Sequence, residues 1–166
     1  MNKETFGWRM AKCSEFAYLN SKEAKPKYKD LGFSRHRYFD VNGAQCHAAY
    51  DKEWFVLAFR GTEVKSWSDI KADLNVLSVG AKHSRGRVHE GFEKEVDKLW
   101  VGIRDYVIKQ RKGRKLVITG HSLGASMATI VAARLHKATF KIDGLYTYGS
   151  PRVGNSTFKE NLKIKH

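Results

Sequence analysis

Hydrophobic residues recur along this chain at two different spacings, which separate predicted helices from predicted strands. Near the N-terminus, apolar residues lie four, three and four positions apart, the spacing of one face of an amphipathic helix. A helical period also runs through residues 92–107. By contrast, the unbroken apolar run at residues 54–59 predicts a strand that is buried on both faces. The two helical faces consist of Phe6, Met10, Cys13 and Ala17, and of Phe92, Val96, Leu99, Trp100, Ile103 and Val107.

Turn residues and shorter apolar runs place the remaining elements. Asn42 and Gly43 tolerate positive φ and lie between two strand-like segments, so they predict a tight hairpin of residues 37–41 with residues 44–50. The second half of the chain alternates between strand and helix patterns at residues 116–119, 125–135 and 145–148, before a last helix that Asn155 would cap. This alternation predicts an α/β protein with a mostly parallel central sheet. Because the chain of 166 residues contains no repeat or linker, we expect a single domain over residues 1–166.

The charge of the chain narrows the choice of partners. Its 31 Lys and Arg residues against 17 Asp and Glu give a net charge of +14, which attracts nucleic acid or an anionic lipid surface. The basic residues are spread along the chain, and the densest cluster, residues 109–115, is expected to be a solvated loop. The chain has neither zinc-finger spacing nor an aromatic-interleaved RNA-binding pattern. Transient contact with an anionic lipid surface is therefore the preferred interpretation of the charge.

The N-terminal segment and the cysteines bear on localisation. The first ten residues contain no apolar stretch typical of a secretory signal, and no apolar run approaches the length of a membrane span. We therefore expect a cytoplasmic protein, or one exported by a route without a signal. Cys13 and Cys46 are interpreted as two free thiols in a reducing compartment, with a single disulfide as the alternative.

One motif carries a specific chemistry. The pentapeptide Gly120-His121-Ser122-Leu123-Gly124 follows a predicted strand and opens a predicted helix, which is the context that the G-x-S-x-G nucleophile motif requires. A side chain at position 120 or 124 would collide with the neighbouring strand or helix. The turn would expose the Ser122 hydroxyl beside the helix N-terminus, where the N–H of Leu123 can stabilise an oxyanion. The alternative is an ordinary strand-to-helix turn with a buried serine.

Several motifs together resemble the class 3 lipases, the fungal triacylglycerol lipase type of α/β-hydrolase. The resemblance covers residues 59–155, in the order that the family has them. It rests on Phe59-Arg60-Gly61-Thr62, on Trp67 with Asp69 to Leu74, on Val88-His89-Glu90-Gly91-Phe92, on Thr119 to Gly124, and on Tyr148-Gly149-Ser150-Pro151-Arg152-Val153-Gly154-Asn155.

The resemblance implies an α/β-hydrolase fold and a role for individual residues. Ser122 would be the nucleophile, and Thr62 and Leu123 would supply the N–H groups of the oxyanion hole. Residues 63–72 resemble a lid over the site, with Trp67 and Ile70 on one helical face, although plain core packing explains those two residues equally well. The resemblance implies neither a metal ion nor a cofactor.

The other members of a catalytic triad are not apparent. In α/β-hydrolases an acid and then a histidine follow the serine, but the family segments that carry them have no counterpart after Asn155. We interpret Asp143 as a solvated turn residue and His89 as a structural residue at the start of the helix near Phe92. We name no base among the other histidines, and His136 lies too far along the same helix as Ser122. The α/β-hydrolase fold is therefore expected to be incomplete at its C-terminus, with a completing chain or second subunit as a further partner.

Two functions of different class follow. In the first, the chain is a serine carboxylic ester hydrolase that acts on a lipid or another acyl ester through an acyl-enzyme at Ser122. The second is a catalytically incomplete lipase-like module that binds lipid or a protein partner. A nucleic-acid binder is a third hypothesis, and only the net charge supports it.

Overall fold

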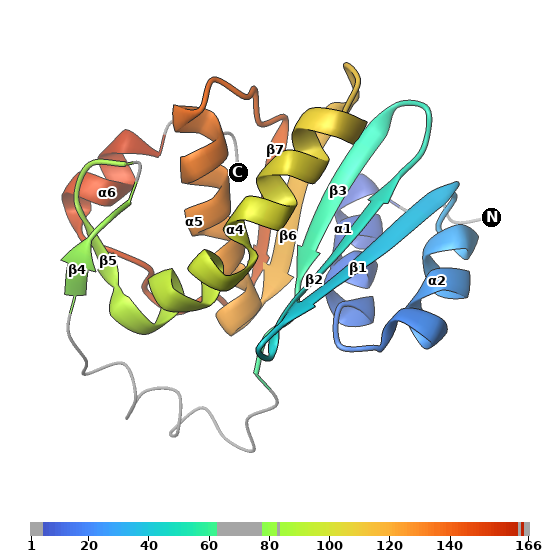
Figure 1. Cartoon of the computed structure of the whole chain (residues 1–166), viewed down its shortest axis with the longest axis horizontal. Helices are drawn as coiled ribbons and strands as arrows, with labels where there is room; N and C mark the ends of the chain where they lie inside the picture. Colours follow the sequence, from blue (N-terminus) through green and yellow to red (C-terminus); the bar gives the residue numbers. More distant parts are fainter. Residues whose placement is uncertain (1–4, 63–77, 83, 163, 165–166) are drawn as a thin grey trace.

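A five-stranded sheet runs through the molecule, with helices against both of its faces (Figure 1). The computed structural model describes residues 5–62, 78–82, 84–162 and 164. In spatial order the strands are β1 (Arg35–Val41), β2 (Ala44–Tyr50), β3 (Trp54–Phe59), β6 (Lys115–His121) and β7 (Gly144–Tyr148). Strand β2 pairs antiparallel with both β1 and β3, whereas β3–β6 and β6–β7 are parallel pairs. Four strands therefore run in one direction, and the predicted mostly parallel sheet is confirmed.

Helices from the first and second halves of the sequence cover opposite faces of the sheet (Figure 1). Helices α1 (Phe6–Phe16) and α2 (Ser21–Asp30) lie on one face, and α4 (Glu90–Gln110) and α5 (Leu123–Lys137) lie on the other. The remaining elements are the short hairpin of β4 (Ser78–Gly80) with β5 (Arg87–His89), and helix α6 (Ser156–Asn161). Among the described residues, β7 has no neighbour on its outer side, so it forms one edge of the sheet.

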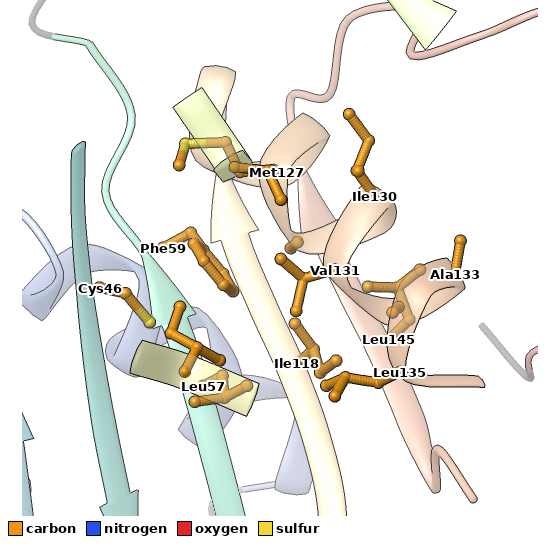
Figure 2. Packing of buried hydrophobic residues seen from close by; sticks show 14 of the residues in the cluster. Cys46, Leu57, Phe59, Ile118, Met127, Ile130, Val131, Ala133, Leu135 and Leu145 are labelled. Atoms are coloured by element: carbon orange, nitrogen blue, oxygen red, sulfur yellow. The ribbon is translucent and has the colours of Figure 1, made fainter. Parts of the chain in front are cut away.

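Alternating side chains of the central strands fill two separate cores. Leu57 and Phe59 of β3 and Ile118 of β6 belong to the larger core, on the side of α4 and α5. Figure 2 shows these side chains packed towards Val131 and Leu135 of α5. The residues between them, Val56, Ala58 and Val117, belong to the smaller core beneath α1 and α2. Burial on both faces explains why the sequence of β3 is continuously apolar.

The predicted hairpin and the predicted helix cap at Asn155 are confirmed. Asn42 and Gly43 have φ values of 49° and 83°, as a tight turn between β1 and β2 requires. Asn155 caps α6 through its side chain, which accepts a hydrogen bond from the Phe158 amide. His89 has the structural role that we expected, because its side chain accepts a hydrogen bond from the Gly91 amide at the start of α4.

Helix α2 and the β4–β5 hairpin were not predicted. Helix α2 contains Pro26 and buries only Ala24 and Tyr28, so its apolar stripe is too narrow to show a helical period. The signal that predicts it is the capping box of Asn20 with Glu23, in which each side chain bonds the other residue's amide. The strands β4 and β5 are three residues each, which is too short for a pattern of alternation.

The basic cluster at residues 109–115 is bound to the protein at two positions, so the expectation of a solvated loop is wrong for these side chains. Arg114 donates to the carbonyl of Gln110 at 2.9 Å and lies over the Tyr50 ring. Arg111 lies 3.7 Å from the carboxylate of Asp143. Long guanidinium side chains can bind carbonyls, rings and carboxylates at once, which a count of charges does not reveal.

A buried ion network joins α4, α5 and the β4–β5 hairpin. Arg134 of α5 is only 1% exposed, and its Nη2 lies 2.8 Å from Glu93 and 2.7 Å from Asp97, both on α4. Lys82, between β4 and β5, donates its amide to Glu93 and its ammonium group to Asp97. The network therefore fixes the hairpin to the two helices beside it.

Both cysteines are buried free thiols, which confirms the predicted free thiols over the alternative of a disulfide. Burial raises the pKa of Cys13 to about 12 and that of Cys46 well above its usual value. A buried thiol of this kind is inert, because only the thiolate reacts. The free thiols therefore carry no requirement for a reducing compartment.

Candidate active site

Ser122 lies at a sharp turn between β6 and α5. Its φ of 56° and ψ of −126° are unusual for a residue with a side chain, and they reverse the chain within one residue. A Cβ on Gly120 would overlap the carbonyl of Gly124, and a Cβ on Gly124 would overlap the carbonyl of Phe59. The expectation that both positions require glycine is therefore confirmed.

The Ser122 hydroxyl is buried, so the expectation that the turn would expose it is wrong. It has no hydrogen-bond partner among the described residues. The backbone of Ser122 is well held, because its N–H donates to the Tyr148 carbonyl at 2.9 Å and its carbonyl accepts from the Ala125 amide at 3.0 Å. A buried hydroxyl without a partner costs about 1–3 kcal/mol and needs an explanation in a native structure. At a strand-to-helix turn, a catalytic role is one such explanation.

Thr62 and Leu123, the two residues predicted to donate to an oxyanion, line the same cavity. Thr62 follows β3, and Leu123 is the first residue of α5, where the amide has no partner within the helix. The cavity has a volume of about 600 Å³. Its apolar wall comprises Ala44, Phe92, Leu123 and Met127, and its polar wall includes Gln45, Arg60, Thr62, His89, Glu95 and Lys98. The expected lid residues Trp67 and Ile70 lie outside the described residues.

None of the described histidines is hydrogen-bonded to the Ser122 hydroxyl. His121 Nδ1 is hydrogen-bonded to the Tyr18 hydroxyl at 2.8 Å. His36 and His47 form a pair on β1 and β2, with 2.8 Å between His36 Nε2 and His47 Nδ1. Burial lowers the pKa of His47 to about 3 and that of His36 to about 4. Neither histidine had a partner that could be predicted from the sequence, because the register between β1 and β2 brings the two rings together.

Asp143 is partly buried and bonds the start of β6, so its interpretation as a solvated turn residue is wrong. Its carboxylate accepts from the Leu116 amide and from Lys141, each at 2.9 Å. Partial burial opposes its ionisation, yet these two hydrogen bonds and the nearby Arg111 lower the pKa of Asp143. It precedes β7 and bonds the start of β6, whereas Ser122 follows the end of β6. It therefore lies at the other end of the strands from Ser122.

Comparison with known proteins agrees with this arrangement. The family described as lipase (class 3) matches residues 56–166. The chain belongs to the class 3 lipase family. A secreted mono- and diacylglycerol lipase of Fusarium solani is 46% identical over 74 residues, which cover 43% of this chain and 22% of the relative. A secreted mono- and diacylglycerol lipase of Penicillium cyclopium is 35% identical over 116 residues, which cover 64% of this chain and 36% of the relative.

The fold of this class 3 lipase family member is similar to that of solved lipases. Lipase II of Rhizopus niveus superposes with a TM-score of 0.78 at 22% identity, over 95% of this chain and 66% of that one. This similarity confirms the predicted α/β-hydrolase fold. The chain spans about two thirds of that structure, and well under half of the two curated relatives.

The comparisons overturn the expected localisation. We expected a cytoplasmic protein or one exported without a signal, but the Fusarium and Penicillium relatives are both secreted lipases, so that expectation is wrong. The physical reason is that secretion signals are not part of the folded domain, so the hydrophobic pattern that predicts the fold carries no information on export. In the part of the chain that the structure describes, no helix is both long enough and apolar enough to cross a membrane.

Proposed function

We propose that this chain carries the nucleophile of an exported serine lipase that hydrolyses acylglycerols. The observation that supports it most strongly is the geometry of Ser122, a buried hydroxyl without a described partner on a strained strand-to-helix turn. Membership of the class 3 lipase family gives this geometry its chemical interpretation. The secreted mono- and diacylglycerol lipases among its relatives support both export and an acylglycerol substrate.

The proposed reaction is an acyl transfer through Ser122. The Ser122 oxygen attacks the ester carbonyl, and its proton passes to a histidine outside the described residues, which then protonates the departing alcohol. The amides of Thr62 and Leu123 stabilise the oxyanion that forms in between. Water then hydrolyses the acyl-enzyme by the same steps in reverse order.

The cavity that Thr62 and Leu123 line suits an acyl chain next to a polar alcohol. Phe92, Leu123 and Met127 give it an apolar wall, while Gln45 and Arg60, which are hydrogen-bonded to each other at 2.7 Å, contribute to the polar one. A volume of about 600 Å³ lies within the range of small-molecule sites. A monoacylglycerol or diacylglycerol combines both kinds of surface in one molecule.

The test is fatty-acid release from emulsified acylglycerols by the purified chain and two variants. Ser122→Ala is expected to abolish turnover, by about 10⁴-fold or more, because no other group replaces the nucleophile. Ser126→Ala is the matched control, since Ser126 is equally buried and its hydroxyl also lacks a described partner. Turnover that survives in Ser122→Ala would refute the proposal.

The alternative is a module that binds lipid or a partner protein without hydrolysing it. The observation behind it is that no described histidine bonds the Ser122 hydroxyl. This alternative predicts lipid binding with no fatty-acid release, unchanged in Ser122→Ala. The same two variants therefore separate the two functions.

A further inference from the structure

Helix α1, together with Tyr18 two residues beyond its end, bonds the strand that precedes Ser122 at several points, although α1 lies outside the residues that the family matches. The Ser14 hydroxyl is hydrogen-bonded to the Thr119 hydroxyl at 2.7 Å, and both groups are buried. One turn later, the Tyr18 hydroxyl bonds His121 Nδ1 at 2.8 Å. Thr119 and His121 precede Ser122 by three residues and one residue. The N-terminal helix therefore contacts the end of β6 immediately before the turn.

The Tyr18 hydroxyl also contacts the strand that leads to Thr62. A Cβ added to Gly61 would overlap this hydroxyl and would lie only 2.6 Å from the carbonyl oxygen of His121. The hydroxyl, Gly61 and His121 therefore meet at one point. Gly61 directly precedes the proposed oxyanion residue Thr62, and His121 directly precedes the proposed nucleophile.

We propose that Tyr18 is a positioning residue, whose hydroxyl sets the spacing between the Ser122 turn and the Thr62 end of β3. The proposal rests on the function proposed above for Ser122 and Thr62. Its physical basis is that an oxyanion donor must lie within about 0.5 Å of its productive position relative to the nucleophile. The paired part of β3 and β6 ends at Phe59 with Gly120, and the Tyr18 phenol contacts both chain segments just beyond that last pair.

The contacts of the tyrosine ring favour a fixed phenol. The ring centroids of Tyr18 and His121 are 6.0 Å apart, and the Arg60 guanidinium lies 5.8 Å from the centroid of the Tyr18 ring. On β7, the backbone carbonyl of Tyr148 accepts a hydrogen bond from the Ser122 amide. The Tyr148 hydroxyl donates a hydrogen bond to the Gly7 carbonyl at 2.8 Å. Two tyrosines therefore connect α1 to the Ser122 turn.

The test compares Tyr18→Phe with Tyr50→Phe by NMR. Tyr50 is the matched control, because it loses a hydroxyl that bonds Gln110, and it pairs with Phe55 near the start of β3, at the other end of the strand from Gly61. In Tyr18→Phe we expect the amide resonances of Leu123 and Thr62 to shift together. We also expect the His121 ring, held in one tautomer in the parent, to populate both tautomers. In Tyr50→Phe these resonances are expected to stay in place. Shifts confined to α1, or equal shifts in both variants, would overturn the proposal.

The kinetic counterpart uses a soluble ester substrate. Tyr18→Phe is expected to lower kcat about tenfold, as the loss of one well-placed hydrogen bond in the transition state would, with KM within about twofold of the parent. An unchanged kcat would contradict the positioning role. If the parent protein hydrolyses no ester, the proposed function fails by itself, and the amide shifts still decide whether Tyr18 couples the two strand ends.

His121→Ala removes the hydrogen-bond partner of the Tyr18 hydroxyl. This variant is expected to shift the Thr62 amide resonance as well, and a Thr62 resonance that does not move in it would also refute the proposal.

Discussion

At the scale of single residues, Ser122 combines a strained backbone with a buried hydroxyl that has no described partner. A residue in such a sparsely populated conformation costs about 1–3 kcal/mol, and glycine would adopt it without that penalty. The unpartnered hydroxyl adds a desolvation cost of its own. Both costs are explained if the oxygen at this position performs chemistry.

The glycine at position 124 is predicted to be indispensable for folding. In Gly124→Ala the new Cβ would overlap the Phe59 carbonyl, and the backbone of Arg60 and Gly61 lies within 3 Å of it. Because backbone atoms cannot move aside as a flexible side chain can, we expect a loss of about 3 kcal/mol or more in the free energy of unfolding, measured by urea denaturation.

Gly102→Ala is the matched control for this substitution. Its Cβ would meet only the Phe39 ring at 3.7 Å, which is an ordinary contact, and Gly102 lies within α4. Alanine is therefore expected to stabilise the protein there by about 0.5–1 kcal/mol. Equal effects at the two glycines would show that the turn does not require glycine.

Local spacing predicted the turn, but not the residues that support it. A Cβ at Gly120 would clash with Gly124 within the same pentapeptide, whereas a Cβ at Gly124 would clash with Phe59 on the neighbouring strand. Tyr18 reaches His121 across 103 residues of sequence, and Arg134 reaches Glu93 across two helices. Such partners depend on the order of the strands in the sheet and on which helices pack side by side. A pattern read along one chain does not contain that information.

At the scale of elements, the buried guanidinium of Arg134 is predicted to hold α4 against α5. Arg134→Met would leave the Glu93 carboxylate, which is 3% exposed, without its cation. An uncompensated buried charge costs about 3–5 kcal/mol, and the urea midpoint is expected to fall accordingly.

The control for this prediction is the same substitution at an exposed ion pair on α4. Arg104 pairs with Asp105, and both side chains are more than 40% exposed. Arg104→Met should leave the urea midpoint nearly unchanged, because exposed pairs contribute little. If Arg134→Met is as stable as Arg104→Met, the network does not carry the contact between the helices.

The histidine pair between β1 and β2 is predicted to make the fold sensitive to acid. His47 Nε2 lies 3.1 Å from the Leu19 carbonyl, so it donates there, and Nδ1 accepts from His36. Burial, with Lys25 near His36, lowers the pKa of His47 to about 3 and of His36 to about 4. In the unfolded chain both titrate near pH 6.5. Their contribution to stability is therefore complete above about pH 6.5 and is lost as the pH falls towards 4.

This sensitivity is measured as the difference between urea midpoints at pH 7.5 and pH 5. His47→Gln is expected to reduce that difference, because the pair no longer has to be protonated on unfolding. His136→Gln, at the exposed end of α5, should leave it unchanged. A difference that persists in His47→Gln would assign the acid sensitivity to other groups.

At the scale of the whole molecule, the proposed site is assembled from both layers of the fold. Helix α5 supplies Leu123, strand β3 leads to Thr62, and α1 on the opposite face bonds the strand between them. The cavity lies on the side of α4 and α5, where Phe92 and Met127 line it. The sheet thus lies between the cavity on one face and helix α1, which contacts β6 from the other face.

The central claim is that Ser122 is an activated nucleophile, and labelling with a fluorophosphonate tests it most directly. Such a reagent reacts with a serine only where a base and an oxyanion hole activate it. We predict one adduct by intact mass, mapped to Ser122, present in Ser126→Ala and absent in Ser122→Ala. A folded protein that takes up no label, or a label that remains in Ser122→Ala, would contradict the account.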